Sequence, residues 1–205
     1  MQHYETLKQF QNKEKEYEMY LEWFKTLPLY HEETHFRAVH ACWDNQHIAT
    51  LRNKLVNDRL TDELIYESEK KETDLYFAIE ETLKGKELPM PEGKSFNDKD
   101  GNERKEIRIK WWENQSKMTY KSISIEPIDG LPEERINHSS LERLNYYPEN
   151  DKKVFFGHYW LKGEPSLYKK NICCLDYSIA KGGKLAAYRF DEKTSSDEQN
   201  FIYVS

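Results

Sequence analysis

Apolar residues in the N-terminal part of the chain recur with the spacing of an amphipathic helix. Tyr17, Tyr20, Leu21 and Phe24 follow this period. Pro28 ends the pattern, because proline has no amide hydrogen for a helix interior. The sequence therefore predicts a helix that stops just before Pro28.

Helical spacing returns further along the chain. Apolar residues predict a helix over 45–57. Thr61 and Thr73 are each typical of an N-cap, because a threonine hydroxyl accepts a hydrogen bond from a free amide of the first turn. Gly85 is predicted to end the helix that Thr73 begins.

The remaining apolar segments are short and predict strands. The segments expected to be extended are 36–41, 106–111, 120–125, 154–156, 172–177, 185–190 and 201–204. Helices followed by such strands predict an α/β (α+β) fold with a mixed sheet flanked by helices, in a single domain over 1–205. Residues 126–152 are polar and irregular, and we expect an irregular insertion there.

The charge balance and cysteine usage bear on compartment and partners. The formal net charge is -6, which argues against nucleic acid as a partner, because such proteins usually carry a basic surface. Three cysteines, Cys42, Cys173 and Cys174, fit a reducing compartment. No leader and no apolar run of membrane-spanning length is seen, so we expect a cytoplasmic protein without membrane attachment.

Two histidines stand at the ends of predicted strands. His40 follows the apolar segment 36–39, and His158 follows Gly157 and the segment 154–156. Strand ends on a rigid scaffold commonly present ligands, and neutral imidazole binds Zn, Mn, Fe or Ni. Taken singly, each histidine is more commonly a packed or surface residue than a metal ligand.

The residues around both histidines resemble motifs of the calcineurin-like (phosphoprotein-phosphatase-type) metallophosphoesterases. Segment 37–44 resembles the fourth motif of that family, a strand that ends in His-Ala or His-Gly, and 155–160 resembles the fifth motif, Gly-His. Further similarity to a bacterial branch of the family lies at 27–29, 80–85, 108–112, 174–178 and 182–189.

This resemblance implies a fold and a metal site. The fold would be about half of the family's αββα sandwich, its C-terminal part. His40 and His158 would bind the same ion of a two-metal centre that holds Mn, Fe or Zn. The family's first three motifs, Gly-Asp-x-His, Gly-Asp-x-x-Asp-Arg-Gly and Gly-Asn-His-Glu, do not occur in this sequence. They supply the aspartate and asparagine ligands and a catalytic histidine.

The resemblance therefore predicts a fragment of a phosphatase-like hydrolase that begins downstream of the third motif. Two neutral imidazoles bring no negative charge to balance two divalent ions, so we expect the chain to be inactive alone. An apolar face left uncovered would pair with a separate N-terminal half or with a second copy. The alternatives are a non-catalytic binding module of the same fold, or an unrelated metal- or nucleotide-binding protein.

Other residues are candidates for supporting roles. Arg108, Lys110 and Arg189 are candidates for binding the phosphate oxygens of a phosphoester substrate, although Arg108 and Lys110 equally fit the solvent face of a strand. Asp44 and Asp176 are candidates for fixing the tautomer of a ligand histidine. Asp176 equally fits a turn.

Overall fold

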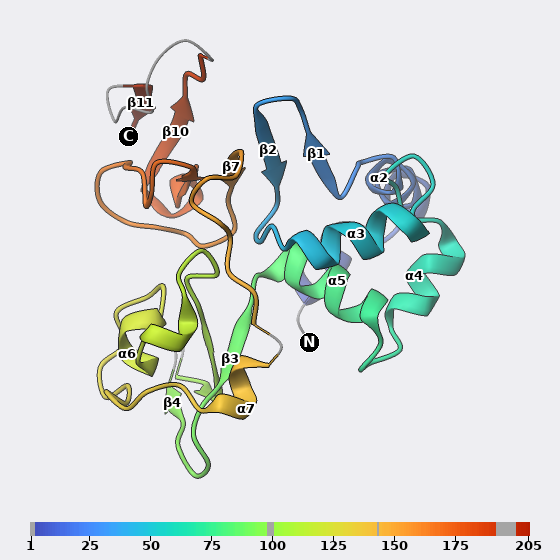
Figure 1. Cartoon of the computed structure of the whole chain (residues 1–205). Helices are drawn as coiled ribbons and strands as arrows, with labels where there is room; N and C mark the ends of the chain where they lie inside the picture. The colour runs from blue at the N-terminus through green and yellow to red at the C-terminus, as the bar shows by residue number, and fades with distance from the viewer. Residues whose placement is uncertain (1–2, 98–100, 143, 192–199) are drawn as a thin grey trace.

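The computed structural model describes residues 3–97, 101–142, 144–191 and 200–205, and it combines helices with a mixed β-sheet, as the sequence predicts (Figure 1). The helices are α1 (Tyr4–Gln9), α2 (Glu14–Lys25), α3 (Asn45–Lys54), α4 (Asp62–Ser68), α5 (Asp74–Lys84), α6 (Tyr120–Ile123) and α7 (His138–Leu141), with 3-10 turns η1 (Gln115–Lys117) and η2 (Ile179–Lys181). The strands are β1 (Tyr30–Glu32), β2 (Phe36–Val39), β3 (Glu87–Pro89), β4 (Phe96–Asn97), β5 (Glu103–Arg104), β6 (Glu106–Arg108), β7 (Lys153–Phe156), β8 (Ile172–Cys174), β9 (Asp176–Tyr177), β10 (Lys184–Tyr188) and β11 (Phe201–Val204).

The main sheet has four strands in the order β1-β2-β7-β8. β1 and β2 form an antiparallel hairpin, whereas β2 and β7 are parallel, with Ala38 opposite Phe155. β7 and β8 are also parallel. Since parallel strands end at the same edge of a sheet, the segments that follow β2 and β7 emerge side by side.

Helices α3 and α5 pack against each other beside this sheet (Figure 1). Their apolar residues Ile48, Leu51 and Leu75 join Val154 and Ile172 of the sheet in one buried core. Burial of such side chains is the main force that holds the layers together.

The predicted helix boundaries are confirmed at several points. α2 ends before Pro28. The hydroxyl of Thr61 accepts the amide of Leu64 at the start of α4, and the hydroxyl of Thr73 accepts the amide of Tyr76 at the start of α5. α5 ends at Gly85, whose φ of 84° is a conformation that side chains rarely adopt.

A second cluster of buried residues surrounds the two-stranded β3–β6 sheet and α6. Its members are Leu88, Ile107, Ile109, Tyr120, Ile123, Leu131 and Ile136. The prediction of a strand over 120–125 is wrong, because Thr119 and Ser122 form a capping box that starts helix α6. The predicted strand at 106–111 is shorter than expected, since β6 ends at Arg108.

Residues 126–152, described except for 143, are largely irregular and contain the short helix α7. Leu131, Ile136 and Tyr147 from this segment are nevertheless buried, so it contributes to both clusters. The last strands, β9, β10 and β11, form an antiparallel sheet of their own. In the part of the chain that the structure describes, no helix has the length and apolar character needed to cross a membrane.

Candidate functional site

His40 and His158 lie together at the ends of the parallel strands β2 and β7. Their ring centroids are 5.1 Å apart, and the ring planes are inclined at 59°. The backbone amide of Gly157 donates a hydrogen bond of 2.9 Å to the carbonyl of His40, which ties the two segments to each other. The two histidines that the family resemblance paired therefore lie next to each other in the fold.

The C-terminal end of α5 holds both segments. The amides of Ala41 and Cys42 donate to the carbonyl of Thr82 at 3.0 and 3.4 Å, and the backbone of Lys84 lies close enough to His158 to act on the pKa of its imidazole. Since the C-terminus of a helix carries partial negative charge, this arrangement favours a cation beside the two rings. His158 itself adopts a positive φ of 74°, which is uncommon for a residue with a side chain.

One nitrogen of His158 is left free. Nε2 is buried and has no hydrogen-bond partner. Burial, together with the nearby charges of Arg108 and His40, lowers the pKa of His158 to about 4, against the opposing charge of Asp176. The ring is therefore neutral at pH 7, which is the form of imidazole that binds a metal ion.

A different group of side chains has the spacing of a three-ligand metal site. Asp44, His47 and Glu81 place one ligand atom each within 4.8 Å of one another, and they are the group of this kind found among the described residues. However, the Lys86 ammonium contacts Asp44 Oδ2 and lies 3.5 Å from Glu81 Oε2. A cation of the protein already neutralises these carboxylates, so the group is a buried ion-pair network.

Asp44 belongs to that network. Its Oδ1 accepts the amides of Gln46 and His47 at 2.7 and 3.3 Å and so caps α3. Burial by itself would raise the pKa of Asp44, but the charge and hydrogen bond of Lys86, the charge of His47 and the amide of Gln46 together hold the pKa below its usual range. Asp44 thus anchors the segment that follows His40.

Asp176 lies closer to the histidine pair. Its Oδ2 accepts the amide of Trp160 at 3.3 Å, and its Oδ1 accepts the amide of Ser178 at 3.1 Å. It therefore holds the turn that follows His158, which agrees with the turn role considered from the sequence. Its charge acts on His158 by raising the pKa of the imidazole.

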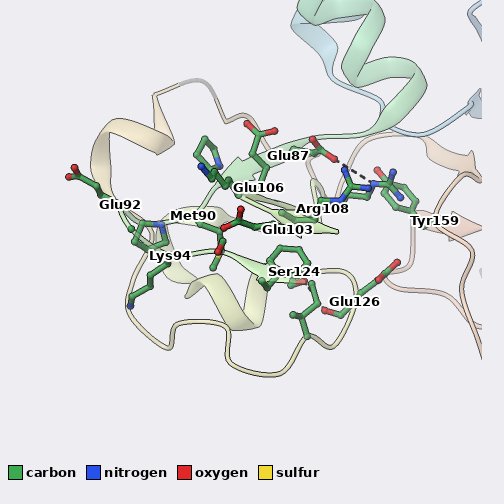
Figure 2. Close-up of a pocket in the computed structure, with 18 of the residues that line it drawn as sticks. Glu87, Met90, Glu92, Lys94, Glu103, Glu106, Arg108, Ser124, Glu126 and Tyr159 are labelled. Carbon is green, nitrogen blue, oxygen red and sulfur yellow. Dashed lines mark hydrogen bonds and ion pairs between the residues drawn. The ribbon is translucent and has the colours of Figure 1, made fainter. Parts of the chain in front are cut away.

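A pocket of about 910 Å³ opens beside His158 (Figure 2). Arg108 of β6 lines it together with His158, Tyr159 and several glutamates. Of the three basic residues singled out from the sequence, Arg108 is the one that this pocket contains. Lys110 donates to the carbonyl of Ser122 at 3.0 Å, and the exposed Arg189 follows β10, where its amide donates to the carbonyl of Asn200 at 2.9 Å.

Sequence reasoning missed Lys86, Glu87 and Glu106. A buried lysine after a helix-ending glycine has no sequence signal of its own. The alternation of Glu106 and Arg108 in a predicted strand places them on one face, but only the strand pairing brings Glu87 opposite Arg108.

Comparisons with protein-family models, with curated proteins and with solved structures find no match to this chain at the significance required. The case for a function therefore depends on the residues and their geometry.

Proposed function

We propose that this chain supplies the His40–His158 half of a divalent-metal site for phosphoester hydrolysis, within a fold related to the C-terminal half of the metallophosphoesterase sandwich. The observation that carries the proposal is the meeting of two imidazoles at the ends of adjacent parallel strands, one of them with a buried and unpartnered Nε2. A buried ring nitrogen without a hydrogen-bond partner costs free energy unless a ligand binds it.

The donor set fits Mn, Fe or Zn, because neutral imidazole is a common ligand for each of them. When bound, such an ion polarises a phosphoryl oxygen and activates water. The residues of this chain would hold it through His40 and His158, keep His158 in the neutral form, and present Arg108 to the phosphate oxygens. Guanidinium suits that task because it donates in a planar fork.

Carboxylate ligands would have to come from another segment or chain. No group of three ligands that includes His40 or His158 occurs in the described parts of the chain. In this proposal the completing polypeptide covers the apolar side of α2, whose Trp23 and Phe24 are 52% and 55% exposed. An apolar groove of about 880 Å³ runs from α2 to His40 and would bring that polypeptide to the histidines.

Metal binding by the purified chain tests the proposal. Isothermal titration with Mn²⁺ and Zn²⁺ should show one ion bound, and His40→Ala or His158→Ala should weaken binding by roughly tenfold or more. His35→Ala is the matched control, because His35 is exposed and precedes β2, whereas His40 follows the opposite end of that strand. Unchanged metal affinity in both site variants would contradict the proposal.

Hydrolysis of p-nitrophenyl phosphate separates the half-site from a complete enzyme. The chain alone should show no metal-dependent turnover, and activity should appear when a polypeptide with the three missing aspartate and asparagine motifs is added. Full activity of the chain alone would refute the half-site.

A non-catalytic binding module of the same fold is the second candidate. It is favoured by the Asp44–His47–Glu81 group, in which Lys86 stands where a metal would be needed. This candidate predicts no metal uptake and no activity with any completing polypeptide, while the pocket beside Arg108 still binds an anionic ligand.

A further inference from the structure

Glu87, Glu106 and Arg108 line the same pocket (Figure 2). In the antiparallel β3–β6 pair, Glu87 stands directly opposite Arg108, and Glu106 stands opposite Pro89. Arg108 Nε lies 3.7 Å from Glu87 Oε1, and Glu87 also forms a side-chain hydrogen bond with Glu106. Glu87 therefore lies between the guanidinium of Arg108 and a second carboxyl group.

A hydrogen bond between two carboxyl groups requires a proton on one of them, because two carboxylates only repel. Burial raises the pKa of Glu87, the charge of Glu106 raises it further, and Arg108 and Arg104 oppose the shift. Glu87 thus holds a proton more readily than an isolated glutamate does. Once protonated, Glu87 donates to Glu106 and no longer neutralises Arg108.

Arg108 is also close enough to the histidine pair for its charge to lower the pKa of His158. The guanidinium of Arg108 therefore lines the same pocket as the two glutamates and His158 of the candidate half-site. Whether Arg108 is paired with Glu87 or available to an oxyanion depends on whether Glu87 is ionised.

We infer that Glu87 is a positioning residue that withholds Arg108 from oxyanions when ionised and releases it when protonated, with Glu106 as the acceptor of that proton's hydrogen bond. This inference depends on the proposed function, in which Arg108 binds the phosphoryl group. The affinity of Arg108 for oxyanions should therefore increase as the pH falls.

Sulfate binding to the metal-free full chain tests the inference, since sulfate keeps its charge between pH 5 and pH 8. The Nε–H signal of Arg108 in nitrogen-15 NMR spectra, assigned with Arg108→Lys, reports binding. Between pH 7.5 and pH 5 the sulfate affinity should rise about two- to fivefold, the range expected for releasing a half-exposed ion pair. Glu87→Gln should bind with the higher affinity at both pH values.

Two further variants sharpen the test. Glu106→Gln removes the neighbour that favours the proton on Glu87, so the rise in affinity should move to lower pH. Glu133→Gln removes an equal charge from an exposed carboxylate that pairs with Lys121, and it should behave as the unmodified chain does.

A pH dependence that persists in Glu87→Gln would overturn the inference and assign the effect to the histidines. An Arg108 signal that sulfate leaves unchanged at every pH would overturn it as well. Because the assay contains no metal, loss of metal binding in the histidine variants is a separate outcome and tests only the proposed function.

Discussion

Replacing Lys86 with methionine removes the cation from the buried network next to His40. The side chains of Lys86 and Asp44 are only 1% and 2% exposed. Lys86 Nζ contacts Asp44, lies 3.5 Å from Glu81 Oε2, and donates to the carbonyl of Asn145 at 3.3 Å. Methionine has a similar length, so the packing volume is largely kept and the loss is mainly electrostatic.

Removing one partner of a buried ion pair costs about 3–5 kcal/mol, because the other charge stays buried without compensation. That is a large share of the roughly 5–15 kcal/mol by which domains are stable. The double variant Asp44→Asn with Lys86→Met removes both charges of the pair, so neither stays buried without its partner. Asparagine still caps α3. We expect the double variant to lose about 1 kcal/mol, less than Lys86→Met alone, so the effects of the two single variants should not be additive.

Urea unfolding followed by tryptophan fluorescence measures these free energies, with the single variant Asp44→Asn completing the cycle. The pair lowers the pKa of Asp44, so its stabilisation is present above the ordinary aspartate pKa of about 3.9 and is lost as the pH falls through the native pKa. A cost below about 1 kcal/mol for Lys86→Met, or additive single effects, would refute this account.

Three further outcomes are expected. Gly85→Ala should destabilise the chain by about 1–3 kcal/mol in thermal or urea unfolding, because φ is 84° and the added Cβ would lie 2.2 Å from Tyr159 Oη; combining it with Tyr159→Phe should recover part of the loss, and an unchanged stability would contradict the geometry. Thr73→Ala should cost about 1 kcal/mol by removing the cap of α5, whereas Thr73→Ser should cost little, and equal losses in both would exclude the capping explanation. His158 should remain neutral at pH 5.5 in NMR titrations because its pKa is lowered to about 4, so its contribution to stability falls only as the pH drops from about 6.5 toward 4; a midpoint near 6.5 would show that the ring is not buried as described.

Local signals in the sequence decided the helix boundaries. Each signal acts within its own residue and the next turn. The causes are the missing amide hydrogen of Pro28, the hydroxyl groups of Thr61 and Thr73, and the unrestricted φ of Gly85. Apolar runs likewise sufficed for β2 and β7, because buried strands need little beyond a short run of apolar residues. The helix at α6 was missed although its capping pair, Thr119 and Ser122, is also local.

Histidines at the ends of two apolar strands were visible in the sequence as separate candidates. That His40 and His158 meet was implied only by a family resemblance, and it is the parallel pairing of β2 with β7 that brings the rings to 5.1 Å. Strand order and direction depend on long-range burial, which no local pattern encodes.

Tertiary structure alone decided the charges around the histidines. Lys86 is buried against Asp44 because α5 ends where α3 begins to pack, and Glu87 faces Arg108 because β3 pairs with β6 in one register. The sequence by itself determined which residue types stand at the strand ends. Distance and burial decide which of these residues form ion pairs, are removed from water or lack a hydrogen-bond partner. Both exist only once the chain has folded.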